Sequence, residues 1–330
     1  DFAAARKGDP NYKSTTRDVR LILDSLKAEN VDAVLLDLRN NGGGSLQEAI
    51  ELTGLFIDKG PVVQVRQVNN KIEVESDKEA GVKWDGPFGV IINRFSASAS
   101  EIFAGAIQDY GRGVILGSTT FGKGTVQSAV EMERFISPTN QILLKASKSE
   151  DDADTPEGAP EYGQINVTIA KFYRVNGSST QHKGVDADIT FPTQYSAEKF
   201  GESAEKAALP WDQINSASYN KVNNLSTINT TLEDLHQKRL AKSDEYKFLL
   251  EDIEEFNKLD AAPQISLNQA KLKQERDTNK AKNRERINKL LELHNMPLWK
   301  EGQPQPKVEF DFILDESLNV MADLIPLTKK

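Results

Sequence analysis

Short apolar segments alternate with segments of helical spacing along the first 193 residues, and this alternation constrains the fold more than any other feature. Residues 33–38 and 88–92 are almost continuous apolar runs of strand length, as expected of strands that are buried on both faces. Each run is followed by a turn and then by apolar residues at helical spacing. Because strands and helices that alternate in this way build a covered sheet, the pattern predicts an α/β core.

The other elements of this region follow from the same periodicities. Thr15 is expected to be the N-cap of a helix, with Asp18 as the acidic residue at the third helical position. Residues 149–163 are acidic and rich in Pro and Gly, which predicts a loop. Further helices are expected at 46–52 and 98–110, a hairpin at 62–65 and 72–74, and strands at 88–92, 114–116, 125–130, 142–144 and 167–170.

The pattern changes after Pro192. Residues 231–259 and 266–294 combine Leu with many charged residues at helical spacing, and Pro263 separates them, which predicts a hairpin of long polar helices. Residues 308–314 are expected to form a strand. We therefore divide the chain into a core at 1–193 and a mostly α-helical C-terminal domain at 194–330.

Composition excludes several classes of protein and site. The chain of 330 residues contains no Cys, which excludes disulfides and thiolate metal sites. The net charge of -9 argues against a general nucleic-acid binder, because contact with phosphates normally needs a basic surface. Since no apolar run approaches the roughly 18 residues of a membrane-spanning helix, an integral membrane protein is not expected.

Ser98 is the first candidate for chemistry, because it follows a predicted strand and opens a predicted helix. There it would face unpaired backbone N–H groups and the positive end of the helix dipole, which favour negative charge on a substrate carbonyl. Ser98 and Glu101 also have the spacing of a capping box, which is a purely structural explanation. Asp109 shares the face of Ser98, where it would hold charged groups near the site or form a salt bridge at the helix end.

Lys123 is the second candidate and stands between Gly122 and Gly124. If it is buried, its charged form is disfavoured, its pKa falls and it can act as a base; in a surface turn it would have no such role. No histidine lies near Ser98 in the sequence to suggest a Ser–His–Asp set, although the fold could bring one to it, and a Ser–Lys pair is a known variant of the same logic. His182 stands in a polar stretch and is expected at the surface.

Two glycine-rich segments could hold an anion. Residues 117–123 almost form a phosphate-binding loop, but Gly124 stands where the Ser or Thr that binds Mg²⁺ should be. A strand is also predicted at 125–130, where a helix N-terminus would have to hold the phosphate, so nucleotide binding is not expected. The glycines at 42–44 follow a strand and free the backbone to aim N–H groups at an oxyanion or a phosphate.

Three segments in this order resemble the carboxy-terminal processing proteases, and in particular their bacterial tail-specific members. They are Arg39-Asn-Asn-Gly-Gly-Gly44, Asn93-Arg-Phe-Ser-Ala-Ser-Ala-Ser-Glu-Ile102 and Thr120-Phe-Gly-Lys-Gly-Thr-Val-Gln127. Residues 167–193 and the polar helices that follow Leu209-Pro-Trp211 are similar to the same proteases. The resemblance therefore covers nearly the whole chain.

The resemblance implies a site and an activity. Ser98 would be the nucleophile and Lys123 its general base, with Gln127 orienting the lysine. The oxyanion donors would be the N–H groups of Gly43, Gly44 and Ala99, with Glu101 and Asp109 as supporting residues. The implied fold is an α/β core like that of crotonase and the Clp-type proteases. The implied substrates are polypeptides with exposed apolar, unstructured C-termini, cut without ATP or metal in the periplasm with the help of an adaptor lipoprotein.

Two departures from the family are visible. No segment before the core matches the PDZ domain that reads a substrate C-terminus, and Ala187 stands where the family more often has proline. Because the chain begins at Asp1 without Met or signal peptide, we expect a fragment or processed form whose recognition and activation depend on the preceding part. The alternative interpretation is a catalytically inactive fragment that acts as a protein-binding module.

Overall fold

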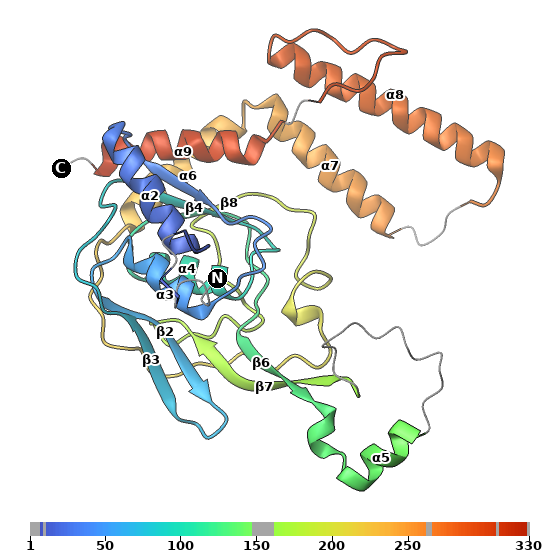
Figure 1. Ribbon diagram of the computed structural model, residues 1–330. Coiled ribbons are helices and arrows are strands. Elements are labelled where there is room, and N and C mark those ends of the chain that lie inside the picture. The colour runs from blue at the N-terminus through green and yellow to red at the C-terminus, as the bar shows by residue number, and fades with distance from the viewer. Residues whose placement is uncertain (1–6, 9–10, 147–161, 262–265, 308–309, 329–330) are drawn as a thin grey trace.

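The computed structural model describes residues 7–8, 11–146, 162–261, 266–307 and 310–328. Its core contains two four-stranded sheets, one parallel and one antiparallel, and helices cover the parallel sheet (Figure 1). The predicted α/β core followed by C-terminal helices is confirmed.

The parallel sheet has the strand order β1 (Val34–Asp37), β4 (Phe88–Ile92), β5 (Val114–Gly117) and β8 (Ile189–Thr190). Leu36 is in register with Val90, and Val90 with Ile115, so the apolar side chains of neighbouring strands stack across the sheet. Helices cover both faces, which explains why β4 and β5 are buried along their whole length.

The antiparallel sheet has the strand order β3 (Ile72–Asp77), β2 (Gly60–Gln67), β7 (Gln164–Tyr173) and β6 (Thr125–Glu131). The predicted hairpin is formed by β2 and β3. Strand β6 follows the loop that carries Lys123 and pairs with β7 at the edge of the sheet. The sheet therefore supports one of the two segments that were expected to carry chemistry.

Helix α4 (Ala99–Asp109) lies between the two sheets (Figure 1). Phe103 and Ile107 belong to the apolar cluster of the parallel sheet, whereas Ile102 and Ala106 belong to the cluster of β2 and β7. Because both sides are covered, nearly every residue of the helix is buried. Its N-terminus, which follows Ser98, is consequently fixed by packing on both sides.

The remaining elements of the core are short. Helix α2 (Thr15–Ala28) has Ser14 as its N-cap, not the predicted Thr15, because the Ser14 side chain accepts the N–H of Arg17. Helix α3 (Leu46–Gly54) follows the glycine-rich turn and packs against α2 and α4. The part of the core and its connections that the structure describes also contains the 3₁₀ turn η1 (Met132–Phe135), helix α5 (Pro138–Ala146) and the 3₁₀ turn η3 (Glu202–Ala204).

The C-terminal helices form two pairs. Helices α6 (Ser226–Leu240) and α9 (Phe312–Thr328) pack on the parallel sheet, α6 against β8 and α9 against β4, and Leu232 and Val320 are fully buried there. Inside this pair, His236 Nδ1 lies 2.8 Å from Glu316 Oε1. Helices α7 (Asp244–Ala261) and α8 (Gln269–Leu293) project from the body as an arm (Figure 1).

Three predicted elements are wrong. Residues 142–144 belong to helix α5, which begins at Pro138, a residue well suited to the first turn of a helix. The apolar residues from 312 onward open helix α9, where the Asp311 carboxylate accepts the N–H of Leu314 at 3.1 Å. Residues 231–259 contain parts of α6 and α7, which a turn at 241–243 separates. Pro263 and most of the predicted 149–163 loop lie outside the described residues.

Candidate active site

Ser98 ends the turn between strand β4 and helix α4, residues 93–98, here called the serine turn. Its backbone has φ of 57° and ψ of -115°, a left-handed conformation that is costly for a residue other than glycine, by roughly 1–3 kcal/mol. Ala97 N–H donates to the carbonyl of Asn41 at 3.0 Å, and the Ser96 hydroxyl donates to the carbonyl of Leu38 at 2.7 Å. These bonds join the serine turn to the glycine-rich turn and hold Ser98 in a strained, partly exposed position.

Glu101 joins the serine turn to the lysine loop (residues 120–124). Its carboxylate Oε2 accepts the N–H of Ser98 at 2.7 Å and the N–H of Lys123 at 2.9 Å. The other oxygen, Oε1, accepts the Thr120 hydroxyl at 2.6 Å and the N–H of Gly122 at 2.7 Å. Because one oxygen holds both Ser98 and Lys123, the two backbone nitrogens lie side by side although 25 positions separate the residues.

Glu101 is fully buried, with an exposed fraction of 0%. Burial raises the pKa of this carboxyl from its ordinary value of 4.5 to about 7, although the hydrogen bonds from Thr120, Gly122, Ser98 and Lys123 act in the opposite direction. The capping-box bond in which the Glu101 side chain accepts the N–H of Ser98 is therefore present. The same carboxylate also binds the lysine loop through the N–H of Lys123.

The back of the lysine loop is held by residues that follow β7. Gly124 N–H donates to Gln181 Oε1 at 2.8 Å, and His182 N–H donates to the carbonyl of Gly122 at 2.9 Å. The expectation that His182 is a surface residue is wrong, because its Nε2 is buried and the fold brings it against the lysine loop. Gln181 has an exposed fraction of 0%. The sequence signal for these contacts was weak, since Gln181 stands in a short polar run like many surface turns.

Gln127 lies on β6 and is exposed. Its Nε2 donates to the Thr125 hydroxyl at 2.6 Å. Gln127 therefore lies on the strand that follows Lys123, and its side-chain amide donates to a residue of that same strand. Lys123 itself is partly exposed.

The glycine-rich turn approaches the serine turn closely at Gly43. A Cβ atom on Gly43 would lie 2.6 Å from the carbonyl oxygen of Ala97 and 2.7 Å from the nitrogen of Ala99. The Gly43 N–H donates to Asn41 Oδ1 at 3.0 Å, so it would have to leave this bond to act as an oxyanion donor. Gly44 and Ala99 border the same small pocket beside Ser100.

We expect Gly43→Ala to reduce peptide cleavage by at least about 100-fold, since a displacement of about 1 Å in a catalytic group has that effect. The added methyl would collide with the turn that carries Ser98, and φ of 93° is strained for alanine. Gly42→Ala is the matched control, because its Cβ would meet nothing within 4 Å. Steady-state cleavage by both purified variants, with thermal melting to check folding, tests this; equal activity of the two would contradict it.

Asp109 lies at the far end of α4. Its carboxylate forms an ion pair with Arg174 at 2.6 Å and accepts the side-chain amide of Asn176 at 2.7 Å. The structure therefore places Asp109 in the link between α4 and the segment after β7, at the opposite end of the helix from Ser98.

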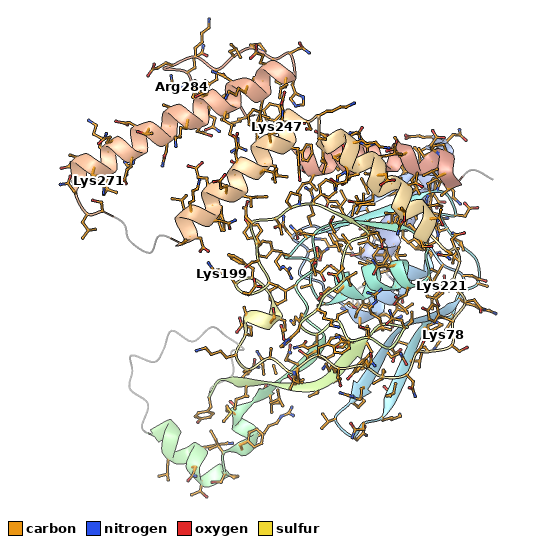
Figure 2. The ribbon with its side chains drawn as sticks, turned by 180° about the vertical axis from the view of Figure 1, so that it is seen from behind. Lys78, Lys199, Lys221, Lys247, Lys271 and Arg284 are labelled. Atoms are coloured by element: carbon orange, nitrogen blue, oxygen red, sulfur yellow. The ribbon has the colours of Figure 1, made fainter. Side chains whose placement is uncertain are left out.

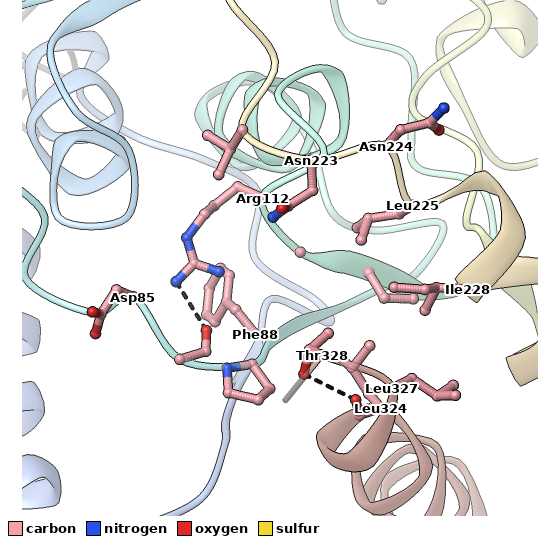
Figure 3. A pocket seen from close by; sticks show the side chains of 15 residues that line it. Asp85, Phe88, Arg112, Asn223, Asn224, Leu225, Ile228, Leu324, Leu327 and Thr328 are labelled. Carbon is pink, nitrogen blue, oxygen red and sulfur yellow. Dashed lines mark hydrogen bonds between the residues drawn. The ribbon is translucent and has the colours of Figure 1, made fainter. Parts of the chain in front are cut away.

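A cavity of about 670 Å³ lies elsewhere, where helix α9 meets the core (Figure 3). Arg112 forms part of its wall and donates to the carbonyls of Phe56 at 2.8 Å and Gly86 at 3.0 Å. Burial lowers the pKa of Arg112 to about 10. None of the predicted site residues lines this cavity, so we assign it no catalytic role.

Among the described residues, no group of three or more His, Asp or Glu side chains is arranged to hold a metal ion. None of the helices in that same part of the chain combines the length and apolar character needed to cross a bilayer.

The sequence model of peptidase family S41 matches residues 7–191, which is more than half of the chain and includes every predicted site residue. The chain belongs to peptidase family S41. Residues 195–326 match a second model, described as the C-terminal domain of tail specific protease. The resemblance to carboxy-terminal processing proteases that the three motifs indicated is thereby confirmed.

Relatives within family S41 include a tail-specific protease of Haemophilus influenzae, which is 41% identical over 95% of this chain and 43% of its own length. The carboxy-terminal processing protease CtpA of Bacillus subtilis is 32% identical over 54% of this chain and 32% of its own length. The solved photosystem II D1 C-terminal processing protease covers 58% of this chain and 42% of its own, with 26% identity and a TM-score of 0.43. The chain thus spans less than half the length of these relatives.

Proposed function

We propose that this S41 chain is a serine endopeptidase that cleaves polypeptides through an acyl-enzyme on Ser98, with Lys123 as general base. The observation that carries the proposal is the shared acceptor: one oxygen of buried Glu101 binds the N–H groups of both Ser98 and Lys123. A nucleophile and its base must be held in a fixed mutual geometry, and this carboxylate fixes both segments. The peptidase family match does not favour the alternative of an inactive protein-binding module.

The reaction would proceed in two halves. Neutral Lys123 accepts the Ser98 proton as the hydroxyl oxygen attacks the scissile carbonyl, and the N–H groups of Ala99 and Gly44 stabilise the oxyanion, each contributing about 3–4 kcal/mol. The C–N bond then breaks, and Lys123 passes its proton to the leaving amine. Water attacks the acyl-enzyme in the second half, with Lys123 again as base. Gln127 would turn from Thr125 to orient the lysine amine.

A small apolar pocket beside this site fits the side chain that precedes the scissile bond. It has a volume of about 120 Å³, adjoins Gly43, Gly44 and Ala99, and is lined on its apolar side by Leu38, Ala49, Leu52 and Phe103. A pocket of this size and character favours a small aliphatic side chain, because a charged or large one would lose hydration or would not fit.

Ala49→Leu is expected to lower cleavage after Leu or Val by at least about 10-fold relative to cleavage after Ala, because one methylene in an apolar pocket is worth roughly 1–3 kcal/mol. Ala49 lies on α3 and lines the pocket, so the longer side chain would fill it. Mass spectrometry of the cleavage sites in one unfolded reporter measures the change. An unaltered distribution of sites in a folded variant would remove this pocket from the proposal.

The wider function follows from the relatives. We propose substrates with exposed apolar, unstructured C-termini, in keeping with the name of the tail-specific relative and of the matched C-terminal domain. A periplasmic location and assistance from an adaptor lipoprotein are proposed from the family resemblance of the three sequence motifs alone. The test is cleavage of one unfolded reporter that carries either an apolar or a charged C-terminal tail. Equal rates for both tails would contradict selection by the C-terminus.

A further inference from the structure

A short segment links the helical arm to the lysine loop. Residues 195–204, here called the strap, follow the core and include the 3₁₀ turn η3 (Glu202–Ala204). Figure 2 labels Lys199 of the strap in the space between the core and helix α7. The proposed mechanism does not use the strap, yet its contacts reach both segments that the mechanism needs.

The first set of contacts joins the strap to the lysine loop. Glu202 N–H donates to the carbonyl of Phe121 at 3.0 Å, and Glu202 Oε1 accepts the Gln181 side-chain amide at 3.0 Å. The oxygen of that same amide accepts the N–H of Gly124 at 2.8 Å. Both the amide nitrogen and the amide oxygen of the buried Gln181 side chain are therefore hydrogen-bonded. Because Glu202 can only accept, it fixes the nitrogen toward itself and the oxygen toward Gly124.

The strap also lies close to Phe121 at Gly201. This glycine has φ of 156°, and a Cβ atom there would lie 3.0 Å from the Phe121 carbonyl oxygen. The main chain of the strap thus packs directly on the loop, so a shift of the strap is transmitted to it.

The second set of contacts joins the strap to the arm and to the serine turn. The ring of Tyr195 lies 4.8 Å from that of Phe95, which belongs to the serine turn, and 5.9 Å from that of Phe256 on α7. Phe200 lies 5.1 Å from Tyr195 and completes the cluster. Lys199 also forms an ion pair with Asp260 near the end of α7. Helix α7 also contacts α9, where the rings of Tyr246 and Phe312 lie 5.9 Å apart, so the strap is a second point of attachment toward the other end of α7.

We propose that Glu202 is a positioning residue that holds Lys123 in its catalytic place through Gln181, and that helix α7 holds the strap through Phe256. The inference rests on the proposed function, because Lys123 must be the base for its position to matter. Lys123 is flanked by two glycines, which give the loop little stiffness of its own. Loss of the Glu202 acceptor would leave the Gln181 amide free to flip and would release the N–H of Gly124.

The test compares Glu202→Ala with Glu202→Gln in the intact protein. Glu202→Ala is expected to lower kcat by about 10- to 100-fold with KM changed less than about two-fold, because loop misplacement affects the transition state more than substrate binding. Glu202→Gln keeps an acceptor oxygen and is expected to retain most activity. If the glutamine variant is as impaired as the alanine variant, or if KM alone changes, the proposal is overturned.

Hydrogen exchange of peptides that cover residues 120–126 gives a readout that needs no activity. Exchange is expected to be faster in Glu202→Ala and unchanged in Glu202→Gln; unchanged exchange in Glu202→Ala would overturn the role of Glu202. If instead Ser98→Ala still cleaves the reporter, the proposed function fails, whereas the exchange result still decides whether Glu202 holds the loop.

Phe256→Ala tests the attachment of the arm. We expect it to lower kcat and to speed exchange in the lysine loop, since the ring contacts Tyr195. Leu259→Ala is the matched control, because Leu259 lies on the same helix with 67% of its surface exposed. Equal behaviour of the two variants would overturn the role of α7.

Discussion

Ser98→Ala and Lys123→Ala are each expected to lower peptide cleavage by about 10⁴-fold or more, and the double variant is expected to be no worse than either one. The reason is that nucleophile and base act as a unit, so their losses do not add. Neither change should unfold the protein, because both side chains are partly exposed and Glu101 binds their backbone N–H groups, which alanine keeps.

The measurement is cleavage of an unfolded reporter by purified variants with matched melting curves. His182→Ala serves as a control for the base, since His182 packs on the lysine loop and is the histidine that a Ser–His mechanism would recruit there. We expect it to retain cleavage. Loss of activity in His182→Ala with retention in Lys123→Ala would contradict a Ser–Lys mechanism.

Glu101→Gln is expected to lower cleavage by at least about 100-fold, comparable to other displacements of catalytic groups. The carboxylate accepts four hydrogen bonds, two on each oxygen, whereas an amide turns one of these acceptors into a donor. Two of the four donors, either the N–H groups of Ser98 and Lys123 or the Thr120 hydroxyl and the Gly122 N–H, would then face another donor. Glu316→Gln is the control, because it alters a buried carboxylate on helix α9, far along the chain from the site.

Glu101 also predicts a pH dependence with a definite sign. Its pKa is raised from 4.5 to about 7, so between these values the folded protein binds more protons than the unfolded chain. The contribution of this group therefore makes the free energy of unfolding decrease as pH rises from 4.5 to 7, by roughly 3 kcal/mol in all. Cleavage should increase over the upper part of this interval, because only the ionised carboxylate accepts all four bonds.

Urea denaturation at pH 5 and pH 8 measures the first effect, and kcat over the same range measures the second. We expect the free energy of unfolding of Glu101→Gln to differ less between pH 5 and pH 8 than that of the wild type, because glutamine does not titrate. An identical pH dependence in the wild type and the variant would show that Glu101 does not titrate in this range.

The sequence identified the core strands well where the signal was local. Residues 88–92 were predicted as a strand and form β4, because a continuous apolar run between turns fits a strand covered on both faces. The run at 142–144 was ambiguous between helix and strand, and only Pro138 distinguishes the helix that forms. The division of the chain after residue 193 stays a prediction, as do the catalytic roles of Ser98, Lys123 and Gln127.

The sequence by itself determined which chemical groups are present: a serine at a helix N-terminus, a lysine between glycines and a glycine-rich turn after a strand, in an order shared with family S41. These are local patterns, and the spacing of Ser98 and Glu101 even predicted one hydrogen bond. Only the tertiary structure decided that Glu101 also binds Lys123, that Gln181 supports Gly124 and that the strap joins the lysine loop to α7. Such contacts join residues that are 21 to 61 positions apart. Their partners are specified by how the two sheets pack around α4, which no short-range periodicity encodes.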